Sequence, residues 1–295
     1  MPLTVGIPFL NAESTLMDAV RSVFAQTYQD WELLLVDDGS SDRSMEIARA
    51  VRDPRVKVIC DGDRKRLSAR LNQIVSEAKY DYVARMDADD LMSPYRFERQ
   101  LTFLGSSNTT LVTSSMAMLS RNLEPIGIRD GGPTIDARSI LRGHSLAHAP
   151  LLAKKEWFCR NRYNEMLSRT QDAELWFRAF LSGELKEGSV LGIRDPLYFC
   201  REEAGVASAK IIESHRALRD LIRTCPPNVL SWSEKEFELG RSHLRSVVIR
   251  GLGALGLLRK VTSGVRNRRI EDAILLDRVR DEIQQVLATK VPGLD

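Results

Sequence analysis

Short apolar segments alternate with helix-like segments from Leu3 to Met86, and this alternation limits the chain to few folds. Apolar runs occupy Leu3 to Phe9, Trp31 to Val36, Arg55 to Ile59 and Tyr82 to Met86. Apolar residues at helical spacing fill the segments between them. Continuous apolar runs suit parallel strands that are buried on both faces of a sheet. Because helical crossovers between parallel strands are right-handed, we expect a doubly wound, Rossmann-like α/β unit that binds a nucleotide.

The rest of the chain divides into a β-rich part and a helical part. Further strands are expected at Thr110 to Leu119, Pro150 to Ala153, Val190 to Ile193 and Leu197 to Cys200. Helical patterns dominate from residue 206, and Ser233 and Glu236 have the spacing of a capping box. The predicted domains are therefore an α/β domain over residues 1–205, with halves at 1–104 and 105–205, and a helical C-terminal extension over 206–295.

Three carboxylates form an acidic turn directly after the fourth apolar run. Asp87, Asp89 and Asp90 precede a helix start at Ser93 and Pro94. Open α/β sheets bind ligands at the carboxyl ends of their strands, and a hard divalent cation would balance the repulsion among adjacent carboxylates. The alternative interpretation is an acidic loop that caps the next helix.

Composition narrows the partners and the compartment. The four cysteines are scattered without a CxxC pair, which favours a reducing cytoplasm over a disulfide framework or a zinc site. We expect no signal peptide, because the N-terminus MPLTVGIPFL begins a strand at once and has neither a basic region nor a small-residue cleavage site. We expect no membrane-spanning helix, because no segment reaches roughly 18 to 20 consecutive apolar residues. A net charge of +3 is too small to indicate a nucleic-acid binder.

Basic residues concentrate in one C-terminal stretch. Residues Leu239 to Ile270 contain eight Lys or Arg residues and no acid. The mixture of cations with Leu and Gly within Val247 to Arg269 predicts a peripheral contact with anionic lipid headgroups. A packed helix with a basic outer face is the alternative.

Four motifs together resemble an inverting family 2 glycosyltransferase with the GT-A fold. They are TVGIPFLN in the first strand, LLLVDDGSSD after the second, ARMDADD as a DxD motif, and TQDAELW, which is similar to the ED-type motif of that family. The resemblance covers roughly residues 2 to 205. It implies a mixed central sheet, with a nucleotide-binding half over 1–104 and an acceptor-binding half over 105–205.

The resemblance also implies roles on the donor side. Asp38 contacts the base, and its carboxylate can accept a hydrogen bond from the imide N–H of uracil or thymine. Pro8 lines the base pocket, Asp87 faces the ribose, and Asp89 is the ligand of Mg²⁺ or Mn²⁺ with Asp90 behind it. A turn or N-cap aspartate is the alternative for Asp38.

Basic residues after the third strand are also candidates for the donor site. Lys65, Arg66 and Arg70 can face the diphosphate, which makes Arg70 a candidate nucleotide-binding residue. Charges on a solvated helix are the alternative.

On the acceptor side, Asp172 corresponds to the general base. Inversion requires a carboxylate opposite the leaving diphosphate that takes the proton of the attacking hydroxyl. A first-turn aspartate can instead simply stabilise its helix. Gln171 departs from the acidic residue common before the base. Glu203 stands where the family often has a histidine that completes the metal site, so it is a candidate replacement ligand.

The expected activity is metal-dependent, inverting transfer of a hexosyl or N-acetylhexosaminyl group. The donor is a UDP-sugar, with a dTDP-sugar less favoured, and the acceptor is a hydroxyl of a glycan or polyprenyl-linked glycan in bacterial surface polysaccharide synthesis. The enzyme is expected in the cytoplasm, at the inner face of the membrane. The alternatives are a nucleotidyltransferase, although PFLNAES is not a Gly-rich phosphate loop, and a non-catalytic sugar-nucleotide-binding protein.

Overall fold

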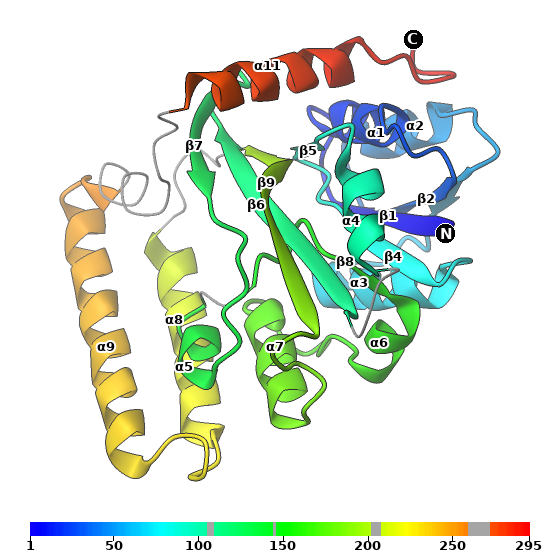
Figure 1. Ribbon diagram of the computed structural model, residues 1–295. Coiled ribbons are helices and arrows are strands. Elements are labelled where there is room, and N and C mark those ends of the chain that lie inside the picture. The colour runs from blue at the N-terminus through cyan, green and yellow to red at the C-terminus, as the bar shows by residue number, and fades with distance from the viewer. Residues whose placement is uncertain (105–108, 144–145, 202–207, 259–271) are drawn as a thin grey trace.

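A nine-stranded mixed sheet forms the centre of the protein (Figure 1). The computed structural model describes residues 1–104, 109–143, 146–201, 208–258 and 272–295. The strand order is β3-β2-β1-β4-β8-β6-β9-β5, with β7 paired to β6. The strands are β1 (Leu3–Phe9), β2 (Trp31–Asp37), β3 (Val56–Ile59), β4 (Tyr82–Arg85), β5 (Leu91–Met92), β6 (Leu111–Leu119), β7 (Pro125–Arg129), β8 (Leu152–Lys154) and β9 (Val190–Arg201).

The N-terminal half is parallel, as the apolar runs predict. β1 pairs in parallel with β2 and β4, and β2 pairs in parallel with β3. Helices α1 (Leu16–Phe24) and α2 (Ser44–Ala50) share one hydrophobic core with β1, whereas α3 (Arg66–Glu77) belongs to a second core. The sheet is therefore covered on both faces. Because β1, β2 and β4 are parallel, their carboxyl ends meet at one edge of the sheet.

The second half makes the sheet mixed, which confirms the predicted fold class. β8 runs antiparallel to β4 and β6, while β6 and β9 are parallel. The two strands expected within residues 190–200 are one strand, β9, whose register against β6 shifts near Ser115. Helices α4 (Arg96–Leu104), α5 (Ala137–Leu141), α6 (Lys155–Arg160) and α7 (Gln171–Leu181) cover this half. The short strand β5, which the sequence pattern did not predict, joins the edge of β9 directly after the acidic turn.

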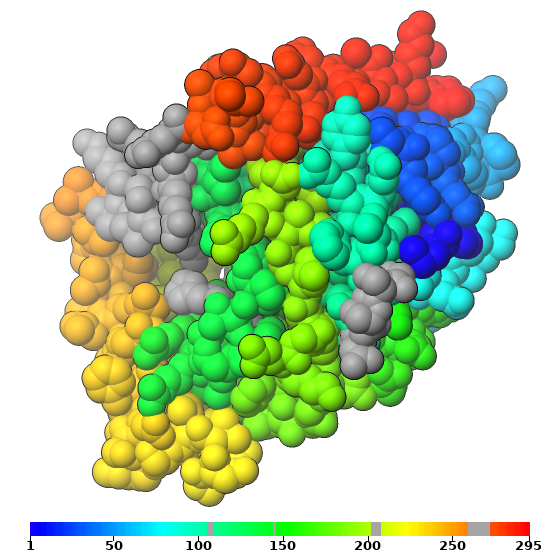
Figure 2. Space-filling model, in the orientation of Figure 1, coloured from blue at the N-terminus to red at the C-terminus, as the bar shows by residue number. Residues whose placement is uncertain are grey.

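The C-terminal region is helical and returns to the N-terminal half. α8 (Ser208–Thr224) and α9 (Trp232–Ala254) form a helical pair, and α11 (Ala273–Ala288) packs against α1. Figure 2 shows the segment from α11 to the C-terminus lying across both halves of the molecule. The backbone N–H of Arg52 donates to the carbonyl of Pro292 at 2.7 Å, and Val291 is buried. Packing thus ties the end of the chain to its first helices.

Three expectations for the helical region can be compared with the structure: the capping box, the absence of a membrane-spanning helix and the basic stretch. The capping box of α9 consists of Ser231 and Glu234, two residues before the predicted pair. Among the described residues, none of the helices combines the length and the apolar character needed to cross a bilayer. Part of the predicted basic stretch, residues 259–270, lies outside the described residues.

Candidate active site

Asp38 lies where β1, β2 and the start of α3 meet. Its backbone N–H donates to the carbonyl of Phe9 at 2.8 Å, which joins the ends of β1 and β2. Its buried carboxylate accepts the backbone N–H groups of Lys65 and Arg66, with Oδ1 at 2.7 and 3.0 Å. Asp38 therefore caps α3, not the helix that follows it in the sequence. Within the part of the chain that the structure describes, Oδ2 accepts only the Arg66 N–H, at 3.1 Å. This oxygen can therefore accept a further hydrogen bond from the N–H of a nucleotide base.

Arg70 is buried behind Asp38. Its Nε donates to Asp38 Oδ1 at 3.0 Å, and its terminal nitrogens donate to Asp61, Gln73 and the carbonyl of Asp63. These contacts use all five N–H groups of the guanidinium. The interpretation of Arg70 as a solvated helix charge is wrong, because the residue has no exposed surface. Its predicted role toward the nucleotide stays a prediction, and the geometry makes that role indirect, through Asp38.

The acidic turn brings its three carboxylates together. One oxygen each from Asp87, Asp89 and Asp90 lies within 4.8 Å of the others. Asp87 Oδ1 accepts from Arg85 Nη2 at 2.6 Å, and buried Asp90 accepts the Arg201 backbone N–H at 2.8 Å. Burial, together with the charges of Asp87 and Asp89, raises the pKa of Asp90 well above its ordinary value. An all-oxygen set under this repulsion fits Mg²⁺ or Mn²⁺ better than zinc.

The helix after the acidic turn has its own cap. Ser93 Oγ accepts the backbone N–H of Tyr95 at 3.3 Å, directly before α4 begins at Arg96. The side chain of Asp90 is instead turned toward β9, where it meets Arg201. The contacts of Asp87 and Asp90 thus give little support to the helix-capping interpretation.

Tyr198 clamps the acidic turn and was missed by the sequence analysis. Its hydroxyl accepts the Asp87 backbone N–H at 3.1 Å, and it lies close enough to Asp90 for the charge of that carboxylate to act on it. Burial and the charge of Asp90 raise the pKa of Tyr198 well above its ordinary value, so the hydroxyl keeps its proton. No local signal could have identified this residue, because its contact depends on β9 lying beside β5.

Replacing Tyr198 with Phe should weaken the acidic turn without emptying the core. The variant keeps the ring but loses the hydrogen bond that the hydroxyl accepts from the Asp87 backbone N–H, and loss of a partner behind metal ligands commonly costs about 10- to 100-fold in metal affinity or activity. We expect a higher Mn²⁺ concentration for half-maximal activity, measured by metal titration of nucleoside diphosphate release. Tyr82→Phe, on β4 outside this cluster, is the control. An unchanged metal titration would contradict the clamp.

Asp172 occupies the first turn of α7 and is half-buried. Thr170, in a left-handed conformation, precedes the helix. Burial works to lower the pKa of Arg85, but nearby acidic groups, Asp87 first, then Tyr198 and Tyr163, and last Asp172, raise the pKa above its ordinary value. Asp172 and the DxD motif, which lie far apart in the sequence, are therefore in the field of one buried guanidinium. Arg85 is the second residue that the sequence analysis missed.

A buried aromatic cluster supports the start of α7. His148 Nε2 is hydrogen-bonded to Tyr163 Oη at 2.7 Å, and the His148 ring meets Trp176 of α7 edge-on at 5.8 Å. Burial, and then the charge of Arg85, lower the pKa of His148 well below its ordinary value. The neutral imidazole therefore packs and positions α7 but does not titrate near neutral pH.

The remaining predicted site residues differ in position and in exposure. Pro8 is buried at the carboxyl end of β1, one residue before the carbonyl that Asp38 contacts. Asp89 lies at the exposed corner of the acidic turn. Glu203, the candidate replacement for a metal-site histidine, lies outside the described residues. The structure thus brings Pro8, Asp38, Asp87, Asp89 and Asp172 to the same side of the sheet, at the ends of β1, β2 and β4 and the start of α7.

A mixed sheet with an acidic turn at the carboxyl ends of its parallel strands is the arrangement of the GT-A class of glycosyltransferase folds. The model of the family described as Glycosyl transferase family 2 matches residues 4–130. EpsE of Bacillus subtilis, which carries a glycosyltransferase name, is 30% identical over 211 residues, covering 68% of this chain and 73% of that protein. The chain therefore belongs to glycosyltransferase family 2 and is a glycosyltransferase, which sets aside the nucleotidyltransferase and non-catalytic alternatives.

Two further proteins are similar to this chain. WfgD of Escherichia coli, named UDP-Glc:alpha-D-GlcNAc-diphosphoundecaprenol beta-1,3-glucosyltransferase, is 28% identical over 120 residues, covering 41% of this chain and 47% of that protein. The crystal structure of S. aureus TarS 1-349 in complex with UDP-GlcNAc superposes with a TM-score of 0.60 at 16% identity, covering 97% of this chain and 82% of that one. The latter likeness establishes the fold alone.

Proposed function

We propose that this chain is an inverting, metal-dependent glycosyltransferase that uses a UDP-sugar, with a dTDP-sugar less favoured. It transfers a hexosyl or N-acetylhexosaminyl group to a hydroxyl of a glycan or polyprenyl-linked glycan during surface polysaccharide synthesis. The observation that supports this most is the acidic turn after β4, where one carboxylate oxygen each of Asp87, Asp89 and Asp90 lies within 4.8 Å of the others, as a site for the cation of a sugar nucleotide requires. The proposed base, Asp172, comes from the other half of the sheet, at the start of α7.

Asp172 is proposed as the general base. The acceptor hydroxyl attacks the anomeric carbon from the side opposite the diphosphate, its proton passes to the Asp172 carboxylate, and the bond from that carbon to the diphosphate oxygen breaks. Inversion follows from the single displacement. Arg85 holds Asp87 in place by the 2.6 Å contact between its Nη2 and Asp87 Oδ1.

Two parts of the structure are proposed to bind the donor: the ends of β1 and β2 bind the base, and the acidic turn binds the ribose and the cation. Asp38, with Pro8 beside it, recognises the base, and Arg70 orients Asp38 from behind. Asp87 faces the ribose, and Asp89 would hold Mg²⁺ or Mn²⁺ with Asp90 in support and Glu203 as a candidate further ligand. Such a cation, when bound, neutralises charge on the leaving diphosphate.

The relatives support the choice of donor and acceptor. The name of WfgD gives it a UDP-Glc donor and a diphosphoundecaprenol-linked acceptor, and the TarS complex contains UDP-GlcNAc. A lipid-linked acceptor would place the reaction in the cytoplasm at the inner face of the membrane. We further propose that residues 1–205 contain the catalytic machinery and that residues 206–295 support and locate it.

A donor panel tests the proposal. Purified protein is incubated with UDP- and dTDP-sugars, with and without Mn²⁺, and release of nucleoside diphosphate is measured. We expect metal-dependent release from one UDP-sugar. Calorimetry with UDP is run in parallel, because the enzyme can bind UDP even when the lack of an acceptor prevents sugar transfer. Failure to bind UDP in the presence of Mn²⁺ would contradict the proposed donor class.

A further inference from the structure

Helix α9 has its polar side turned inward. Its inner positions Glu238, Ser242 and Ser246 contact residues of α5 and α8: Arg142 Nε donates to Glu238 at 3.1 Å, and Arg219 Nη1 donates to the two serines at 3.2 and 3.1 Å. Glu238 and Ser246 are buried. A helix on the surface of a water-soluble domain normally does the opposite and buries its apolar stripe.

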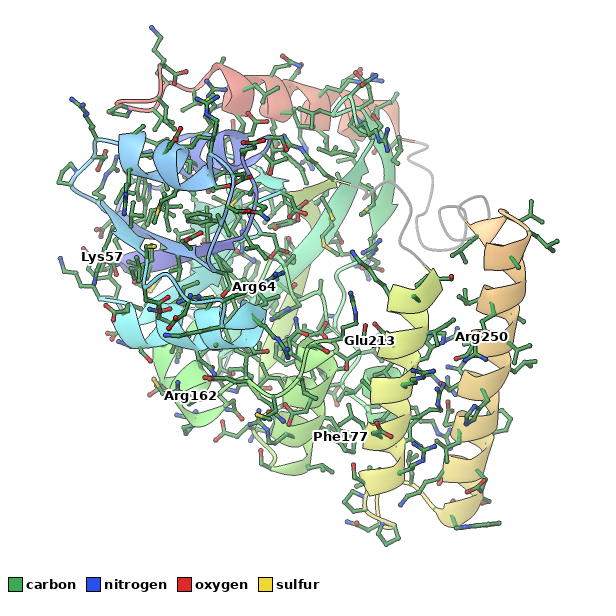
Figure 3. The ribbon with its side chains drawn as sticks, turned by 180° about the vertical axis from the view of Figure 1, so that it is seen from behind. Lys57, Arg64, Arg162, Phe177, Glu213 and Arg250 are labelled. Carbon is green, nitrogen blue, oxygen red and sulfur yellow. The ribbon has the colours of Figure 1, made fainter. Side chains whose placement is uncertain are left out.

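The outer side of α9 is an apolar stripe exposed to solvent. Phe237, Leu244, Val248 and Leu255 are 66%, 65%, 50% and 71% exposed, and we call these four residues the α9 stripe. They recur at intervals of seven, four and seven residues, which places them on one face of the helix. Figures 1 and 3 both show α9 as the outermost element, separated from the sheet by α8. Contiguous exposed apolar residues of this kind mark a surface that another phase or molecule covers.

The charges beside the stripe identify the kind of partner. From Leu239 to Leu258 the described chain contains Arg241, Arg245 and Arg250 and no acidic residue. Arg241 and Arg245 are one turn apart and line one side of the stripe. Arg245 is exposed beside the stripe, whereas Arg250 lies on the side of α9 that faces α8, as Figure 3 shows. An apolar face with cations along one side matches the boundary between acyl chains and anionic headgroups.

We propose that the α9 stripe is a membrane-docking surface that binds anionic lipid bilayers. A single protruding helix 23 residues long can lie in the plane of the interface, with its apolar side chains among the acyl chains and its arginines at the phosphates. Its purpose rests on the proposed function, because docking would bring the catalytic domain to a lipid-linked acceptor. Its evidence is independent of the active site.

Vesicle sedimentation tests this proposal. Phosphatidylcholine vesicles, alone or mixed with phosphatidylglycerol, are pelleted with the full chain at low and high salt. We expect binding to the mixed vesicles that weakens as salt rises, because screening reduces the attraction between arginines and headgroups. Leu244→Gln, Val248→Gln and Leu255→Gln combined should lower the apparent affinity at least about tenfold, since three exposed apolar side chains no longer enter the bilayer. Arg245→Gln, which removes the exposed cation beside the stripe, should reduce the preference for phosphatidylglycerol.

Matched controls keep the result interpretable. Ile274→Gln replaces an apolar residue that is 83% exposed on α11, and it should bind vesicles as the unmodified protein does. Circular dichroism and UDP calorimetry verify that each variant is folded. No sedimentation, or equal sedimentation of the triple variant, overturns the proposal. So does light scattering that shows a dimer dispersed by the triple variant, since a second copy would then cover the stripe. Vesicle binding without UDP binding would instead overturn only the proposed function.

Discussion

Replacing Asp172 with Asn should lower kcat by about a thousandfold, because general base catalysis by a positioned side chain contributes roughly 10²- to 10⁴-fold. Asn preserves the size of the side chain but cannot accept the proton of the acceptor hydroxyl. UDP affinity should change little, since Asp38 and the acidic turn lie on other elements. The measurement is the initial rate of UDP release with donor and acceptor at saturation, together with calorimetry of UDP.

Glu174→Gln is the matched control for Asp172. Glu174 is also an acid in the first turn of α7, where it pairs with Arg178 at 3.1 Å. If Asp172 merely stabilises the helix, both variants should lose similar, small amounts of stability and activity, as expected for charges at a helix N-terminus. A near-normal rate for Asp172→Asn would therefore exclude it as the base.

Replacing Asp89 with Asn should cost two to three orders of magnitude in rate, since a metal supplies several kcal/mol of charge stabilisation and each 1.36 kcal/mol is about tenfold. The Asp89 carboxylate lies within 4.8 Å of those of Asp87 and Asp90, so the amide removes one charge from the predicted cation site. We expect the Mn²⁺ concentration for half-maximal activity to rise as well. Metal titrations of UDP release measure both effects.

Two comparisons separate this role from a general loss of charge. Asp281→Asn removes an exposed carboxylate from α11, away from the acidic turn, and should leave the metal titration unchanged. Asp89→Glu retains an oxygen ligand on a longer side chain and should recover part of the metal response. Equal Mn²⁺ dependence in the original protein and in Asp89→Asn would rule out Asp89 as the ligand.

Local patterns were sufficient to predict the elements that carry the site. β1 spans Leu3–Phe9 as expected, and α7 begins at Gln171, one residue before the proposed base. These predictions succeeded because burial on both faces of a parallel sheet requires uninterrupted apolar runs, and such runs are visible without knowledge of their neighbours. The motifs carried the family assignment for the same reason, since each lies within a few consecutive residues.

Contacts between distant segments were beyond such patterns. Arg85, Tyr198 and Arg70 act on the acidic turn and on Asp38, and two of these three were not identified because a side chain's partners across a sheet depend on strand order. Arg70 had been interpreted as facing solvent or a diphosphate, yet it is buried against Asp38 and Asp61. Strand order cannot be deduced from the strands alone, because many pairings bury the same apolar runs.

The residue sequence alone thus indicated the parallel strands of the N-terminal half, the start of α7 and the chemical type of each candidate site residue, because these depend on local periodicity and on side-chain chemistry. Folding in three dimensions specified which of those residues meet. It placed Asp172 and Asp87 around Arg85, and it turned the polar side of α9 inward so that its apolar side faces outward. The physical reason is that burial and ion pairing are properties of neighbours in space, which residue spacing along the chain does not specify.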